Sequence, residues 1–241
     1  RDRASLDLQW LLQRDLLSAE QVEYAVAQLA YVTGQPLSVE QALRDELLVA
    51  TALWANPERV PRTALDGVGA RWSFTDRVVI GLASRDLRQM WEELLEIQSL
   101  PYPARARQYP RIHQKAVSSS IAALQPDYGQ FDARITAASS RLLLLQIAAT
   151  DLRYRLERGH DPDTLEQLLD LEPGLPLQDP LTGSEFVLED RGSHRYLSST
   201  ALRARSRASL GIEEIAGGIH PETYLELRLP NDSGETISPL D

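Results

Sequence analysis

The feature that most constrains the fold is a run of apolar residues at helical spacing between Phe131 and Arg158. Intervals of four and three residues alternate along this run, through Ala138, Leu142, Leu145, Ala149, Leu152 and Leu156. The alternation places these residues on one stripe of an α-helix, because one helical turn takes about 3.6 residues. Other elements must cover such a stripe. We therefore predict a central helix over 131–158, which ends where Gly159 supplies a left-handed residue.

Two start signals predict further helices before this one. Ser18 is followed by Gln21, and apolar residues then recur at helical spacing, so the pattern is typical of a capping box at a helix N-terminus. The same arrangement recurs at Ser38 with Gln41. A shorter apolar segment predicts a first helix over Asp7–Arg14.

Proline residues interrupt the helical pattern in the middle of the chain. A helix that begins at Ser84 is expected to end at Pro101 and Pro103, because proline lacks a backbone N–H. We predict that the stretch from Pro101 to Pro126 is irregular, with one short helix near 117–124.

Beyond Gly159 the spacing changes from helical to alternating. Pro162 is expected to begin a short helix with Asp161 as its N-cap. After Pro173 the pattern predicts three strands, over 186–189, 194–198 and 223–229. The fold class is therefore mainly α, and α+β overall: a helical bundle with a small antiparallel β part. We predict a helical domain over 1–172 and a β-rich part over 173–241 that packs on the helix 131–158.

Composition excludes several kinds of chemistry. The chain has no cysteine, which excludes disulfides, thiolate nucleophiles and cysteine-bound metals. Its formal net charge is −10, and Lys115 is its single lysine. This charge argues against nucleic acid as a partner, because binding phosphates requires a positive surface. No stretch approaches the roughly 20 apolar residues that cross a membrane. The chain starts at Arg1, so we expect that an upstream segment has been removed.

No catalytic, cofactor or metal site is readable. Glu157 and His160 have the spacing of a helical metal motif, but Gly159 ends the helix between them. Glu92 and Glu96 share a helix face, which usually means a solvated acidic surface. The four histidines, His113, His160, His194 and His220, show no paired spacing. A serine elbow, a phosphate loop and a dinucleotide fingerprint are all missing from the sequence.

One resemblance starts at Arg141, in the stretches RLLLLQIAATDLRYRLERGHDPDTLEQLLDL, LPLQDPLTGSEFVLED and RYLSS. They resemble a group of uncharacterised proteins common in planctomycetes and other GC-rich bacteria. That group carries a long apolar helix, a Tyr-Arg-Leu-Glu-x-Gly-x-x-Pro-x-x-Leu run and an Asp-Pro-x-Thr-Gly turn before a hairpin. The matching positions are Tyr154, Arg155, Leu156, Glu157, Gly159, Pro162, Leu165, Asp179, Pro180, Thr182 and Gly183.

The same order of elements is similar to the globular heads of type II secretion pseudopilins. The resemblance implies an envelope protein in the periplasm or on the outer face of the cytoplasmic membrane, held there by a missing N-terminal anchor. It implies other envelope or membrane proteins as partners, and no activity. The acidic calcium loop of major pseudopilins has no match, because the stretch 198–207 is basic.

The motif residues also have a purely structural interpretation. Gly159 and Pro162 redirect the chain after the helix. Asp179 and Thr182 are suited to bonding backbone groups in a turn in which Pro180 fixes φ and Gly183 takes a positive φ.

Two functions are compatible with the sequence. The first is a noncatalytic envelope protein that binds other proteins, as a subunit of a membrane-associated assembly or a pseudopilin-like scaffold. The alternative is a hydrolase or small-ligand-binding protein whose site is assembled from dispersed residues, such as His160 or His194 with nearby acidic groups.

Overall fold

The computed structural model confirms a mainly helical α+β protein with one small antiparallel sheet. It describes residues 2–13, 16–34, 39–41, 43–45, 47–48, 85, 88–117, 128–191, 194–200 and 226–229. The stretch 223–225, the basic run at 203–207, His220 and most of the predicted short helix at 117–124 lie outside these residues.

The chain divides into two compact units, and each is described by itself. Unit 1 comprises Arg1–Leu37 and Asp132–Asp241, and unit 2 comprises Ser38–Phe131. The predicted division at residues 172 and 173 does not coincide with this one. Unit 1 joins the β part to the N-terminal 37 residues and to most of the central helix, whereas a division at 172 would separate them.

That central helix is α6, Tyr128–Arg158, which starts three residues before the predicted bound and ends as predicted. Gly159 follows it with φ 74°. From Leu143 to Leu152 every residue of α6 is buried, so the helix is covered on all sides and not only along the predicted stripe. The last residue of that stripe, Leu156, is 49% exposed, which corrects its assignment to the core.

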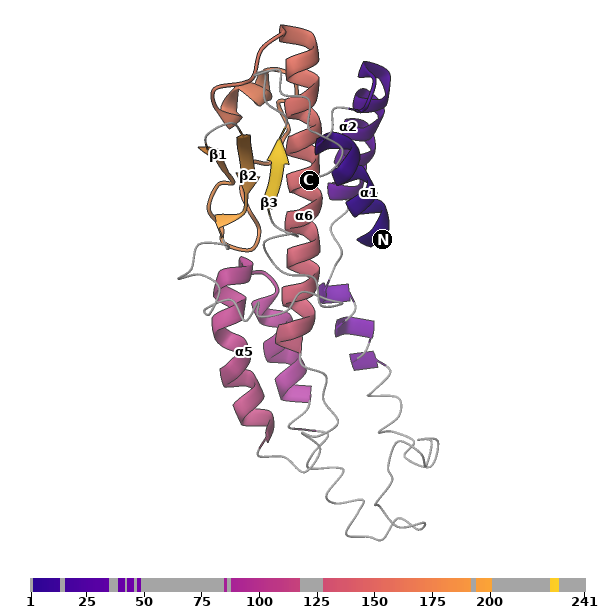
Figure 1. Cartoon of the computed structure of the whole chain (residues 1–241). Helices are drawn as coiled ribbons and strands as arrows, with labels where there is room; N and C mark the ends of the chain where they lie inside the picture. The colour runs from indigo at the N-terminus through magenta and orange to yellow at the C-terminus, as the bar shows by residue number, and fades with distance from the viewer. Residues whose placement is uncertain are drawn as a thin grey trace, which may run out of the picture. The chain divides into compact units, whose positions relative to one another are not determined.

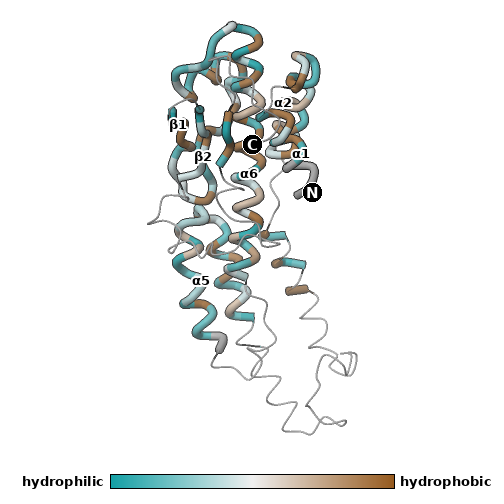
Figure 2. Tube along the Cα trace, viewed as in Figure 1, coloured by the Kyte–Doolittle hydropathy of each residue, from teal (hydrophilic) through white to brown (hydrophobic). Residues whose placement is uncertain are grey.

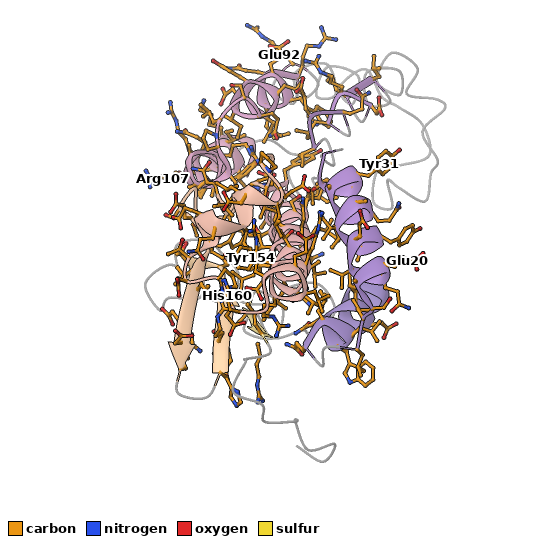
Figure 3. The ribbon with its side chains drawn as sticks, turned by 90° about the horizontal axis from the view of Figure 1, so that it is seen from above. Glu20, Tyr31, Glu92, Arg107, Tyr154 and His160 are labelled. Atoms are coloured by element: carbon orange, nitrogen blue, oxygen red, sulfur yellow. The ribbon has the colours of Figure 1, made fainter. Side chains whose placement is uncertain are left out.

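Two N-terminal helices pack in the same unit. Helix α1, Asp2–Gln13, starts five residues earlier than predicted, and it contacts strand β3. Helix α2, Ala19–Thr33, begins at the predicted capping box, in which Ser18 N donates to Gln21 Oε1 at 2.9 Å. At its C-terminal end, Thr33 hydrogen-bonds to Gln146 of α6 at 2.9 Å. Figures 1 and 3 show α2 and the sheet on opposite sides of α6.

The sheet has the order β1-β2-β3, with both neighbouring pairs antiparallel. The strands are β1, Val187–Arg191, β2, His194–Ser198, and β3, Glu226–Leu229. In β3, Leu227 and Leu229 are buried and alternate with half-buried residues, as the alternating pattern predicts. The first predicted strand, 186–189, is shifted by one to two residues in the structure.

The short helix after Gly159 differs from its prediction. It is a 3₁₀ helix, η4, Leu165–Asp170, and the N-cap position belongs to Thr164 rather than Asp161. The physical reason is that the Asp161 carboxylate faces two guanidinium groups, 3.6 Å from Arg155 Nε and 3.1 Å from Arg195 Nη1. It is therefore directed at these charges rather than at the amides of η4.

The described residues of unit 2 are mainly helical, with helical stretches within 39–48 and over 88–97 followed by α5, Tyr102–Val117. The prediction of an irregular stretch from Pro101 onward was wrong, because α5 runs through Pro110. Pro103 lies in the first turn, where no backbone N–H is needed. Tyr102, Tyr109 and Ile112 are buried, and this packing face stabilises the helix despite the proline within it.

No helix in the described part of the chain is long and apolar enough to cross a membrane. Figure 2 shows hydrophilic and hydrophobic residues interleaved along the helices rather than gathered into one apolar length.

Candidate functional site

The outer face of α2 carries exposed aromatic side chains. The buried face of this helix consists of Val22, Val26 and Leu29. On the opposite face, Tyr24 is 67% exposed and Tyr31 is 65% exposed. The two tyrosines are seven residues apart, which is about two turns, so both lie on one line along the helix. Large exposed aromatic side chains are more typical of binding surfaces than of a solvated helix.

An acidic residue continues this line toward the helix N-terminus. Glu20 precedes Tyr24 by four residues, so the two side chains are neighbours on the same face. Figure 3 shows Glu20 and Tyr31 directed away from α6, on the outer side of α2. We call Glu20, Tyr24 and Tyr31, with the exposed Ala27 and Gln28 between the two rings, the α2 outer face.

The predicted Asp-Pro-x-Thr-Gly turn is built around a buried carboxylate. Asp179 has no exposed surface. Its backbone carbonyl accepts from Gly183 N at 2.8 Å, and Gly183 has φ 71°, in the left-handed region that favours glycine. One carboxylate oxygen, Oδ1, accepts from Leu181 N at 2.9 Å. The turn therefore uses both the backbone and the side chain of Asp179.

Three hydroxyl groups complete the shell of this carboxylate. Ser140 Oγ, from α6, donates to Oδ1 at 2.6 Å. Thr182 Oγ1 donates to Oδ2 at 3.1 Å, and Ser199 Oγ also donates to Oδ2. The donors come from α6, from the turn itself and from the residue after β2. Asp179 therefore joins three parts of unit 1 through neutral donors, which is a structural role.

A second cluster consists of four charged side chains, of which Asp151 and Arg195 are buried and the other two are half-buried. Arg195 Nη1, from β2, lies 3.2 Å from Asp151 Oδ1 on α6 and 3.1 Å from Asp161 Oδ1. Arg155 Nε lies 3.7 Å from Asp151 Oδ2 and 3.6 Å from Asp161 Oδ1. Arg195 Nη2 also donates to the carbonyl of Pro162 at 2.8 Å. The cluster connects β2 to α6 and to the chain that follows it.

Burial governs the protonation of Asp151 in this cluster. Removal from water raises its pKa from 3.8 to about 6, against the opposing attraction of Arg195 and Arg155. The nearby Asp161 carboxylate raises it further. The distances from Asp151 to the guanidinium groups exceed the roughly 2.8 Å of a strong charge-assisted hydrogen bond, which is why the attraction does not offset burial.

The predicted turn residues thus divide between two places in unit 1. Asp179, Pro180, Thr182 and Gly183 form the carboxylate turn, and Pro162 supplies its carbonyl to the charge cluster. Gly159 ends α6 with nothing within 4 Å of an added Cβ, so its positive φ is what favours glycine there.

The other candidate residues do not form a site in the described part of the chain. Glu157 pairs with Arg153 at 2.7 Å. His160 lies beyond Gly159, with its ring 5.6 Å from the Tyr154 ring. No group of three metal-binding side chains occurs among the described residues.

His113, His194 and the acidic residues of 88–97 also form no site among the described residues. His194 contacts Arg228 Nη2 at 2.5 Å, within the sheet. His113 is exposed on α5. Glu92 and Glu96 are exposed, whereas Glu93 accepts from Lys115 at 2.8 Å.

Comparison with known proteins gives no relative: no family model, no curated protein and no solved structure matches the chain. The resemblance described above stays a prediction.

Sequence reasoning missed the α2 outer face, although a signal for it was present. Val22, Val26 and Leu29 define the inner side of α2, and the same spacing puts Tyr24 and Tyr31 on the outer side. Two large aromatic residues opposite a complete apolar face are the pattern that identifies such a surface.

Proposed function

We propose that this chain is a noncatalytic protein that acts by binding other proteins, and that the α2 outer face is its binding surface. The observation that carries this proposal is the pair of tyrosines, each about two-thirds exposed, opposite the face by which α2 packs in unit 1. Tyrosine side chains contribute a large part of the affinity of many protein interfaces, because they bury much surface at a low entropy cost.

The buried polar groups of unit 1 support a binding rather than a catalytic role. The Asp179 carboxylate accepts four hydrogen bonds from groups of its own unit. Asp151 faces two arginines of its own unit. Catalytic carboxylates need a free position toward a substrate, whereas both of these carboxylates are buried against groups of their own unit.

The resemblance adds a location to this proposal. An envelope protein of the kind described would present the α2 outer face to other subunits of a membrane-associated assembly, outside the cytoplasm. This placement depends on the resemblance alone.

The test is a pull-down of the tagged protein from mild-detergent extracts of its native host, quantified by mass spectrometry. We expect the double variant Tyr24→Ser/Tyr31→Ser to lose specific partners that the wild type retains. Leu156→Ser is the matched control, because Leu156 is a similarly exposed apolar side chain of the same unit. Recovery of the same proteins with wild type and double variant would contradict the proposal.

A further inference from the structure

The α2 outer face has a chemistry that selects its partner. At the described residues, three tyrosines lie under an arginine guanidinium: Tyr196 under Arg191 at 4.7 Å, Tyr102 under Arg105 at 5.8 Å and Tyr154 under Arg158 at 6.0 Å. Arginine is attracted to an aromatic face because its cation meets the negative side of the π-system. Contacts between arginine and tyrosine therefore recur in this chain.

Tyr24 and Tyr31 have no such contact within the part of the chain that the structure describes. Their rings are open to solvent, and neither stacks on another ring or receives a guanidinium. The same ring faces that hold arginines elsewhere in the chain are thus available on α2.

Charge favours the same kind of partner. Glu20 lies one turn from Tyr24 on the α2 outer face, and the exposed Glu23 lies at its flank. Neither glutamate has an ion pair in the described residues. A carboxylate beside an aromatic ring attracts a guanidinium, which bonds the carboxylate with two parallel N–H groups and stacks on the ring. The same carboxylates repel phosphate groups, so nucleic acid and anionic lipid surfaces are disfavoured.

Spacing specifies the shape of the partner. The rings are attached seven residues apart, which corresponds to about 10.5 Å along α2. A second helix that lies along α2 repeats its side chains at the same interval every two turns. Two arginines seven residues apart on such a helix would therefore meet the two tyrosines at once.

We propose that the α2 outer face binds a helix of another protein that carries arginines seven residues apart on one side. One guanidinium stacks on Tyr24 and reaches Glu20, and the other stacks on Tyr31. This inference rests on the proposed function, since it names the chemistry of the partner for the same surface.

The test is a titration of the full chain with fluorescein-labelled helical peptides of about 20 residues, long enough to form a stable helix when cross-linked. One peptide carries two arginines seven residues apart. A second has the same composition with the arginines five residues apart, which turns them about 140° from each other. A third has lysines seven residues apart. Anisotropy gives each dissociation constant.

We expect the first peptide to bind roughly tenfold more tightly than the second, because only the first engages both rings. It should bind roughly threefold to tenfold more tightly than the lysine peptide, since lysine neither stacks nor bonds a carboxylate in two places. Tyr24→Ser/Tyr31→Ser should remove the difference between the peptides, whereas Leu156→Ser should leave it intact.

Equal binding of the three peptides, or binding that the tyrosine substitutions do not change, would overturn the arginine proposal. If the native pull-down still loses partners in the tyrosine variant, the proposed function survives that failure. Self-association of the wild-type chain that disappears in the tyrosine variant would overturn the assignment to another protein, because the occupant would then be a second copy.

Discussion

Two buried aspartates of unit 1 are held in different ways. Asp179 is surrounded by neutral donors, three hydroxyls and one backbone N–H. Asp151 faces two guanidinium charges at 3.2 and 3.7 Å, with a second carboxylate nearby. The first arrangement satisfies each carboxylate oxygen with two donors. In the second arrangement, the attraction of the two arginines lowers the pKa of Asp151 and burial raises it. Burial has the larger effect.

The comparison teaches that opposite charge alone does not stabilise a buried carboxylate. Short hydrogen bonds from well-placed dipoles do so locally, whereas longer ion pairs leave much of the desolvation cost in place. The four predictions that follow test this difference, from the largest expected effect to the smallest.

Arg195→Leu is expected to lower the free energy of unfolding of unit 1 by about 4 kcal/mol at pH 7. The loss arises because Asp151 and Asp161 stay buried or half-buried with only Arg155 of the cluster to face them. Hydrogen exchange of the α6 amides in increasing urea measures this quantity for unit 1. Arg153→Leu, which breaks a partly exposed pair, is the control and should cost less than about 1 kcal/mol. Equal losses for the two variants would show that the cluster contributes no more than a surface pair.

Asp179→Ala is expected to lower the free energy of unfolding of unit 1 by about 3 to 4 kcal/mol. The reason is that four donors lose their acceptor inside the protein. Asp163→Ala removes an exposed carboxylate of the same unit and should change stability by less than about 0.5 kcal/mol. The same exchange experiment compares them. A loss below 1 kcal/mol for Asp179→Ala would contradict the structural role of the turn.

The stability of unit 1 should respond to pH through Asp151 in the direction opposite to that of a salt-bridged carboxylate. Its folded pKa of about 6 lies above the unfolded value of 3.8, so the folded state binds the proton more tightly. The tighter proton binding by folded Asp151 contributes roughly 3 kcal/mol to the free energy of unfolding below about pH 4. This contribution is lost as the pH rises to 6.

The check is the stability of the wild type minus that of Asp151→Asn, followed from pH 4 to 7. The variant keeps a neutral side chain throughout, so this difference cancels the titration of other groups. We expect it to fall as pH rises. An increase would mean that Arg155 and Arg195 outweigh the burial of Asp151.

Ser140→Ala should have the smallest effect of these substitutions and lower the free energy of unfolding by about 1 kcal/mol. It removes only one of the four hydrogen bonds to Asp179. The substitution also tests whether α6 and the turn are joined by this bond, since exchange of the turn amides should speed up with that of α6. Faster exchange in α6 alone would place the effect in the helix and not in the connection.

The sequence predicted the elements whose signal is local. The stripe from Ala138 to Leu152 identified α6, the Ser18 capping box identified the start of α2, and alternation identified β3. Helix α5 was missed because Pro103 and Pro110 are local breakers, and the packing of Tyr109 and Ile112 that outweighs them is tertiary.

The two carboxylate clusters were not predicted, because most of their members are far apart in the sequence. Asp151 and Arg155 are one turn apart, so helical spacing could have indicated their pairing. Arg195 joins them only through the packing of β2 on α6. Asp179 was correctly placed in a turn, but its bond to Ser140 spans 39 positions, and no local pattern indicates it.

The central claim is that another protein covers the α2 outer face in the native assembly, and chemical labelling of tyrosine tests it most directly. Tyr24 and Tyr31 should react with tetranitromethane in the purified chain and be protected in mild-detergent extracts of the native host. The buried Tyr102 and Tyr109 should react little in either sample. Equal labelling of Tyr24 and Tyr31 in the purified and native samples would contradict the account.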